Sequence, residues 1–157
     1  MEGIVIITAE DAKEYLSKMI GKPLQYALKS PDLDLYDFGF GGWIQTINRK
    51  GRLHTVTTYS IHAQCPLKVI WRNGTGRADL YDGDTDSHHF HKETESLLGL
   101  PVKRVELSDK NDLWVDLGDY WIVFISWEND EESWRYFLSG ENDPHLVASN
   151  KWLELHN

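Results

Sequence analysis

A chain of 157 residues is long enough for one domain to bury a core without disulfides or metal ions, and a single cysteine, Cys65, excludes an intramolecular disulfide. The net charge is −9; residues 79–157 hold eighteen Asp or Glu and six Lys or Arg, whereas residues 1–78 hold seven and ten. The acidic half repels phosphate groups, so we expect no nucleic acid or anionic membrane as a partner, while a basic protein would be attracted. The first residues lack the features of a signal peptide and no apolar run is long enough to span a bilayer, so we expect one cytoplasmic domain covering residues 1–157.

The first predicted element is an amphipathic helix that begins after an N-cap at Thr8. Apolar side chains recur on one face at helical spacing, at Ala12, Tyr15, Leu16, Met19 and Ile20. Gly21 and Pro23 predict its end, because glycine accepts the left-handed conformation after a helix and proline cannot continue one.

Residues 24–71 are predicted to form β-strands. The turn sequence Asn48–Gly51 joins residues 43–47 to the run 53–63, which is rich in Thr, Val, Tyr and Ile, so we expect a hairpin. Pro66 cannot donate a ladder hydrogen bond, so residues 64–66 are predicted to form a corner or a bulge before the next strand.

The strongest local signal is a hairpin over residues 113–127. Gly118-Asp119 suits a tight two-residue turn, and it separates residues 113–117 from 120–127. The second strand is apolar on both faces, so we predict that it lies inside the domain with Val123 and Ile125 buried or nearly so. Residues 102–107 complete a meander with these two strands.

The segments on either side of this meander are predicted from weaker signals. Residues 79–91 lack periodicity and are predicted as a loop, followed by a short helix over 93–100. Asn129 and Glu132 have the spacing of a capping pair, which predicts a helix carrying Trp134–Leu138. Residues 145–148 and 152–155 are predicted to form a final hairpin.

These elements predict the α+β class. We expect a strongly twisted, mainly antiparallel β-sheet of hairpins and a meander, with the N-terminal amphipathic helix and two short later helices.

Residues 82–93 carry the carboxylate spacing of a calcium-binding loop. Asp82, Asp84, Asp86 and Glu93 stand at positions 1, 3, 5 and 12 of the EF-hand pattern. Position 6, which needs glycine, is Ser87, so we predict a solvated acidic loop without calcium.

Histidines are numerous but scattered. His88, His89 and His91 lie in the acidic segment, whereas His54, His62 and His145 are far from it in sequence. A closed zinc site needs about four convergent ligands, so we predict a surface cluster, with no metal and no cofactor.

The cysteine and most tryptophans are assigned to the core. Cys65 has no basic neighbour closer than Lys68, so we predict a buried, inert thiol. Trp114 shares a strand face with Asp116 and is the candidate for an exposed position. Strand and helix patterns assign the following to core packing: Trp43, Trp71, Trp121, Trp127 and Trp134.

A series of short motifs spans residues 35–147. It consists of Leu35–Gly41, Ile61–Pro66, Asp79–Tyr81, Glu132–Phe137 and His145–Val147. The series resembles an uncharacterised family of small single-domain bacterial proteins of unknown function. This resemblance implies an association with toxin-immunity proteins and supplies no catalytic residue.

The function predicted from these observations is a protein-binding module of immunity-protein type rather than an enzyme. Its contact with a basic protein partner is predicted at Asp79, Asp82, Asp84 and Asp86, which are acidic and close together in the sequence. Two alternatives stay open: an enzyme whose active site is assembled from distant segments, and a divalent-metal-binding module using residues 82–93. The oligomeric state stays open as well.

Overall fold

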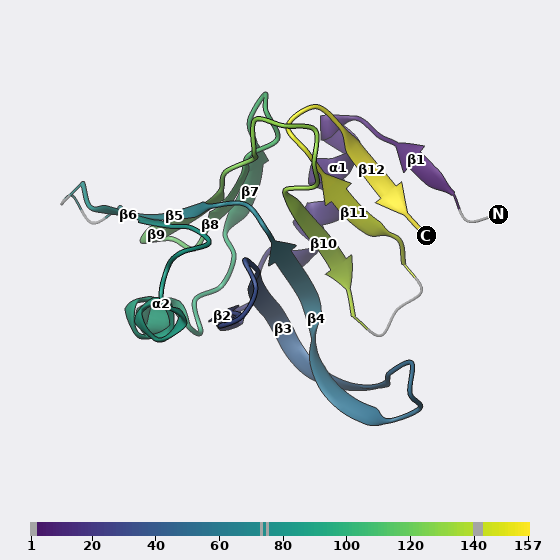
Figure 1. Ribbon diagram of the computed structural model, residues 1–157, viewed down its shortest axis with the longest axis horizontal. Helices are drawn as coiled ribbons and strands as arrows, with labels where there is room; N and C mark the ends of the chain where they lie inside the picture. The colour runs from purple at the N-terminus through teal and green to yellow at the C-terminus, as the bar shows by residue number, and fades with distance from the viewer. Residues whose placement is uncertain (1–2, 73, 75, 140–142) are drawn as a thin grey trace.

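The computed structural model describes residues 3–72, 74, 76–139 and 143–157, and the described chain forms two antiparallel sheets and two short α-helices (Figure 1). One sheet has seven strands in the order β1-β12-β11-β10-β4-β3-β2, and the other has five in the order β6-β5-β9-β8-β7. The predicted α+β class with a mainly antiparallel sheet is therefore confirmed. No helix in the described part of the chain is long and apolar enough to cross a membrane.

The elements have the following bounds. The seven-stranded sheet contains β1 (Ile4–Ile6), β2 (Leu24–Lys29), β3 (Tyr36–Ile47), β4 (Leu53–Ala63), β10 (Trp134–Leu138), β11 (His145–Ala148) and β12 (Leu153–His156). The five-stranded sheet contains β5 (Leu67–Trp71), β6 (Ala78–Tyr81), β7 (Arg104–Leu107), β8 (Leu113–Asp116) and β9 (Tyr120–Phe124). The helices are α1 (Ala9–Leu16) and α2 (Ser87–Thr94), followed by the 3-10 turns Ser17–Met19 and Glu95–Leu97.

The core lies between the inner faces of the two sheets. In the seven-stranded sheet, Phe38, Ile61 and Tyr136 lie side by side on neighbouring strands and are fully buried. The ring of Phe38 meets that of Phe124 from the other sheet edge to face, with centroids 5.1 Å apart. Such contacts between apolar faces supply most of the stabilisation of a two-layer fold.

The chain passes from one sheet to the other at the predicted corner. β4 ends at Ala63 in the seven-stranded sheet, and β5 begins at Leu67 in the five-stranded sheet. Pro66 donates no hydrogen bond, but its carbonyl accepts one from the amide of Ile125, 2.9 Å away. The corner therefore places residues 64–66 beside the end of β9.

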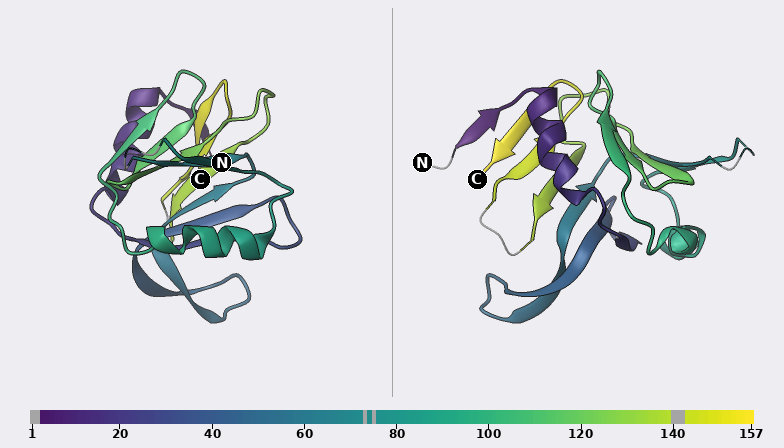
Figure 2. Two further views of the ribbon diagram at one scale, coloured as in Figure 1. Left: turned by 90° about the vertical axis from the view of Figure 1, so that its left-hand side faces the viewer. Right: turned by 180° about the vertical axis from the view of Figure 1, so that it is seen from behind.

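Helix α1 begins where the sequence predicted and ends earlier. The Thr8 hydroxyl accepts a hydrogen bond from the Asp11 amide, and Ala12 and Leu16 are buried. Tyr15 meets Tyr136 of the seven-stranded sheet edge to face, while Lys13 pairs with Glu106 of β7. The helix thus contacts both sheets, as Figure 2 shows from behind.

The loop predicted over residues 79–91 is confirmed only for residues 82–86, and the helix predicted over 93–100 begins six residues earlier. Residues 78–81 form β6, and α2 starts at Ser87 because the Asp86 carboxylate accepts a hydrogen bond from the His89 amide. Phe90 is buried against Tyr36 and Tyr81 and holds the helix on the sheets.

The helix predicted around Trp134–Leu138 is also wrong, because this segment is β10. Trp134 and Tyr136 are fully buried on one face, whereas Arg135 and Phe137 are half-buried on the other, which is the alternation of a strand. The strand pairs with β4 on one side and β11 on the other, so both edges of its backbone are hydrogen-bonded.

The hairpin at Gly118-Asp119 is confirmed, with β8 and β9 paired from Leu113 opposite Phe124. Val123 is buried as predicted, but Ile125 lies beyond the strand and is only half-buried.

The tryptophan predictions are confirmed in part. Of the tryptophans predicted for the core, Trp134 is buried and Trp71 and Trp121 are half-buried, but Trp43 is 54% exposed and Trp127 is 37% exposed. Trp114, the candidate for an exposed position, is half-buried. Trp43 lies where β3 has already left the core, and Trp127 follows the end of β9.

Candidate functional site

A groove opens where four connecting segments meet beside the corner. It encloses about 440 Å³ and is lined by Asp34, Gln64, Pro66, Asp82, Gly83, Asp84, Ile125, Ser126, Trp127 and Glu128. A second hollow of about 310 Å³ shares Asp34, Gln64 and Trp127 with it and adds Leu33 and Leu35. We call the two together the acidic groove.

The apolar part of the acidic groove is built by Pro66, Ile125 and Trp127. The backbone that carries them is held on both sides, because the Ile125 amide donates to the Pro66 carbonyl and the Trp127 amide donates to the Ser133 hydroxyl, 3.0 Å away. Between them the Ser126 amide donates to the Asp112 carboxylate over 2.7 Å. The segment is therefore fixed while the indole of Trp127 stays partly exposed.

One wall of the acidic groove is the turn between β6 and α2. The Tyr36 hydroxyl donates to the Asp82 carbonyl over 2.6 Å, and the Asp84 amide donates to the Asp82 carboxylate over 2.9 Å. Gly83 lets the Asp34 carboxyl group approach closely, because a β-carbon at position 83 would lie 2.8 Å from it. This close approach brings Asp34, from the β2–β3 connection, to the same turn.

The acidic groove carries four carboxylates around an apolar surface. Within the described residues, no ion pair involves Asp34, Asp82, Asp84 or Glu128. Four carboxylates gathered around one surface favour the binding of a cationic group.

The four aspartates predicted as the contact lie in different settings. Asp82 and Asp84 line the acidic groove, but Asp79 and Asp86 do not. Asp79 accepts hydrogen bonds from Arg77, at 2.9 Å, and from the indole of Trp71, at 3.1 Å. Asp86 caps α2. Sequence reasoning missed Asp34 and Glu128, because no local pattern joins them to residues 82–84.

Residues 82–93 do not form a loop of the EF-hand kind. The second half of the segment is helical, and Glu93 at its end faces Arg77 and His89, at 3.5 and 3.8 Å. His91 is engaged as well, since its Nε2 accepts a hydrogen bond from the Lys29 amide over 3.0 Å. In the part of the chain that the structure describes, no group of three or more His, Cys, Asp or Glu is arranged to hold a metal ion.

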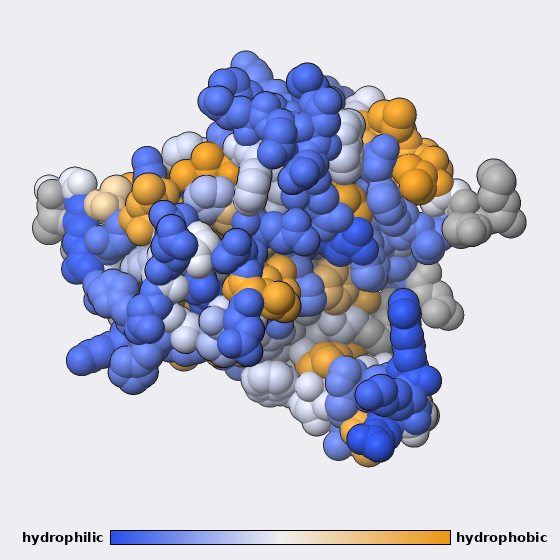
Figure 3. All heavy atoms as spheres, viewed as in Figure 1, coloured by the Kyte–Doolittle hydropathy of each residue, from blue (hydrophilic) through white to orange (hydrophobic). Residues whose placement is uncertain are grey.

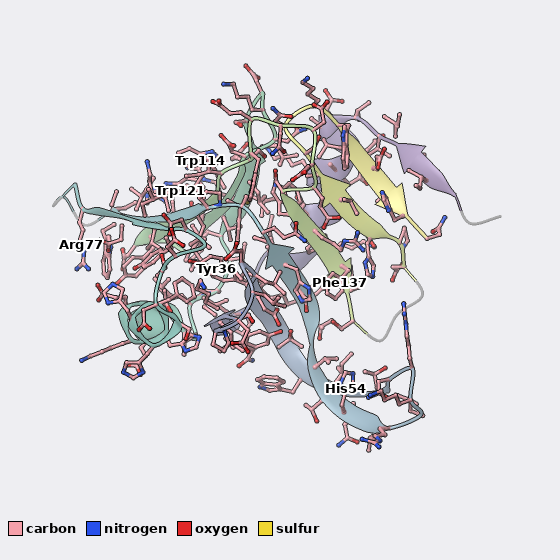
Figure 4. The ribbon with its side chains drawn as sticks, viewed as in Figure 1. Tyr36, His54, Arg77, Trp114, Trp121 and Phe137 are labelled. Atoms are coloured by element: carbon pink, nitrogen blue, oxygen red, sulfur yellow. The ribbon has the colours of Figure 1, made fainter. Side chains whose placement is uncertain are left out.

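A second cluster, which we call the sheet-face cluster, lies on the outer face of the seven-stranded sheet and contains Tyr26, Asp37, His62, Phe137 and His145. His62 and His145, which the sequence left unconnected, lie on either side of Phe137, with ring centroids 4.8 and 4.5 Å from it. His62 Nε2 is 3.2 Å from Asp37, and the Tyr26 hydroxyl donates to the same carboxylate oxygen over 3.1 Å. Figure 4 shows Phe137 over the sheet and His54 apart from it, on the β3–β4 hairpin.

Arg135 borders this cluster. Its guanidinium donates to Glu132 over 2.9 and 3.2 Å and lies 3.2 Å from His145 Nδ1. Burial, and then the Arg135 charge, lower the pKa of His145, so this imidazole is neutral near pH 7. A polar hollow of about 300 Å³ lies between Leu35, His62, Gln64, Glu132 and Arg135.

Cys65 is buried, as predicted. Burial raises the pKa of its thiol to about 12, so the reactive thiolate is scarce near neutral pH. This supports an inert thiol rather than a nucleophile.

No family model matches the chain, and comparisons with curated proteins and with solved structures return no match either. The chemistry of the protein is therefore inferred from the geometry of the acidic groove and of the sheet-face cluster.

Proposed function

We propose that this protein is a protein-binding module of the immunity-protein type, and that the acidic groove receives a basic, partly apolar segment of its partner. The observation that carries the proposal is the set of four carboxylates without an ion pair in the described structure, arranged around Pro66, Ile125 and Trp127.

The chemistry of the acidic groove suits a Lys- or Arg-rich segment. Carboxylates attract the cationic heads, and the exposed edge of Trp127 and the ring of Pro66 can pack against the aliphatic stems. Tryptophan is also enriched among the residues that dominate binding energy at protein interfaces. Because the backbone of residues 125–127 is already fixed, binding loses little conformational entropy on this side.

The proposed function includes a cellular role in the bacterial cytoplasm. The resemblance of the motifs over residues 35–147 to an uncharacterised bacterial family supports a bacterial, cytoplasmic protein that neutralises a basic toxin. The acidic half of the chain would speed the encounter with such a toxin.

The test compares two variants with the same change in net charge. The groove variant carries Asp34→Asn, Asp82→Asn, Asp84→Asn and Glu128→Gln. The control variant changes four exposed carboxylates that also form no ion pair with any described residue, as Glu10→Gln, Glu95→Gln, Asp109→Asn and Asp119→Asn. Wild type and both variants are immobilised and exposed to lysate of the source cell, and a captured protein is then purified for binding kinetics.

We expect a basic protein that wild type and the control variant retain and the groove variant loses. Its association rate should fall about tenfold or more in the groove variant, and should fall for wild type as salt rises from about 0.05 to 0.5 M. Capture that is equal for all three proteins would contradict the proposal.

A second candidate is an acid–base enzyme that uses the sheet-face cluster. The Asp37–His62 pair beside a polar hollow is the observation that favours it, because a carboxylate can orient an imidazole for proton transfer. Turnover of a small molecule by the purified protein that is lost in His62→Ala and kept in the groove variant would favour this enzyme over the binding module.

A further inference from the structure

The β3–β4 hairpin extends well beyond the rest of its sheet. Neighbouring strand β2 pairs with β3 only as far as Phe40, and β10 pairs with β4 only as far as Tyr59. Residues 43–57 continue as two strands and a turn, which we call the arm, and Figure 1 shows it projecting from the body at the bottom of the view.

The surface of the arm is basic and apolar. Ile47 and Leu53 face each other across the two strands and are 69% and 62% exposed. Arg49, Lys50 and Arg52 lie at the tip, and no Asp or Glu occurs anywhere from residue 38 to residue 78. In Figure 3 the arm is the lobe at the lower right, where hydrophilic side chains surround small hydrophobic patches.

The arm is ordered by its own hydrogen bonds. The Asn48 side chain accepts from the amides of Lys50 and Arg52 over 2.9 and 3.0 Å, and the Asn48 amide donates to the Arg52 carbonyl. At the other end, Trp43 stacks on Tyr26 with centroids 5.9 Å apart. The arm is thus presented in one shape, and it would bind with a small loss of conformational entropy.

One surface of this same protein has the complementary chemistry. The acidic groove offers Asp34, Asp82, Asp84 and Glu128 to the three cations of the tip, and Pro66, Ile125 and Trp127 to the exposed Ile47–Leu53 pair. The arm points away from α2 (Figures 1 and 2), whereas the acidic groove is lined by residues 82–84 of the turn that leads into α2, so the arm does not reach the groove of its own copy.

We propose that the arm of one copy docks in the acidic groove of a second copy. The contact joins two different surfaces, so it is heterologous, and each added copy leaves one free arm and one free groove. The inference uses the same groove as the proposed function, and the arm has the chemistry that we propose for the partner's segment. Self-association therefore competes with partner binding and covers the groove while the partner is absent.

The test is sedimentation velocity over a concentration series with three full-length variants. The arm variant carries Arg49→Glu, Lys50→Glu and Arg52→Glu. The groove-reversal variant carries Asp84→Lys and Glu128→Lys, whose side chains make no hydrogen bond within the described structure. The control variant of this test differs from the one described above and carries Lys22→Glu, Lys103→Glu and Lys110→Glu. These three lysines are exposed and lie outside both surfaces. Circular dichroism and melting temperature establish that each variant is folded.

We expect wild type and the control variant to form species heavier than the monomer, with an apparent dissociation constant that rises at least about tenfold from 0.05 to 0.5 M salt. The arm variant and the groove-reversal variant should each stay monomeric. Mixed in equal amounts they should form a one-to-one dimer, since the first retains an intact groove and the second an intact arm.

Three results would overturn the inference: a wild type that is monomeric throughout, an arm variant that still associates, or a mixture in which no dimer forms. The proposed function is judged separately by partner capture, which does not need the arm. If wild type self-associates, an arm variant that captures the partner but stays monomeric would support both proposals. A self-associating wild type that captures no partner would contradict the proposed function alone.

Discussion

The ring of Tyr26 fills the space in which a β-carbon at Gly39 would stand. The two residues are paired on β2 and β3, and the Tyr26 hydroxyl donates a hydrogen bond to the Asp37 carboxylate over 3.1 Å. The same hypothetical β-carbon would lie 2.6 Å from the Thr57 hydroxyl, so it is crowded from two sides.

Gly39→Ala should therefore destabilise the protein by about 1 to 3 kcal/mol, because the tyrosine ring must move off the sheet. Gly42→Ala is the matched control on the same strand, since nothing lies within 4 Å of its added methyl group. Urea denaturation of both variants measures the difference, and equal midpoints would show that the ring adapts without cost.

Asp116, on strand β8 of the five-stranded sheet, is predicted to make the stability of the protein depend on pH in the acidic range. It is buried and accepts hydrogen bonds from Arg72, at 2.7 Å, Arg104, at 3.0 Å, and the Gly118 amide, at 2.7 Å. Burial raises its pKa, but the Gly118 amide and the two guanidinium groups lower it by more, so the pKa lies below its usual value.

A carboxylate with a lowered pKa stabilises the folded state above its unfolded pKa of about 3.9, and this contribution is lost as the pH falls through the folded pKa. Asp116→Asn should cost about 1 to 3 kcal/mol at pH 7, and the gap to wild type should close below about pH 4. Asp119→Asn, in the exposed part of the same turn, should change stability by less than about 0.5 kcal/mol. A gap for Asp116→Asn that stays constant down to pH 2 would disprove the linkage.

Ile122, in the middle of β9, and Ile125, just after its end, are predicted to differ in their importance for stability. Ile122 is fully buried between the sheets, so Ile122→Ala should cost about 2 to 5 kcal/mol. Ile125 lines the acidic groove and is half-buried, so Ile125→Ala should cost only about 1 to 2 kcal/mol. Chemical denaturation distinguishes them, and equal losses would mean that Ile125 belongs to the core.

Asp86 and Asp84 are predicted to have separate roles although they are two residues apart. Asp86→Ala removes the N-cap of α2 and should lower stability by about 1 kcal/mol. Asp84→Ala removes a groove carboxylate and should leave the melting temperature nearly unchanged while it slows partner association. Calorimetry and binding kinetics of the two variants test these separate roles. A lower melting temperature for Asp84→Ala than for Asp86→Ala would contradict them.

Local chemistry determined the hairpins and the start of the first helix. Gly118-Asp119, Asn48–Gly51 and Thr8 act through hydrogen bonds and backbone angles within a few residues of themselves, so their effects could be predicted from the sequence. The apolar character of β9 likewise identified an interior strand.

Tertiary structure determined the conformation of segments whose local sequence signals favoured more than one type of secondary structure. Asn129 and Glu132 resemble a helix cap, yet the aromatic residues of 134–138 form a strand, because β4 and β11 satisfy its backbone on both edges and bury Trp134 and Tyr136. Those neighbouring strands come from residues 53–63 and 145–148, which no local pattern connects to β10.

The candidate sites depend on the tertiary structure in the same way. The sequence identified Asp82 and Asp84 as an acidic pair, but only the corner at Pro66, the end of β9 and the missing β-carbon at Gly83 bring Asp34, Glu128 and Trp127 beside them. His62 and His145 meet across Phe137 because β4, β10 and β11 are neighbours in the sheet. Composition and periodicity describe each segment by itself, whereas a binding surface forms where segments distant in the sequence are packed together.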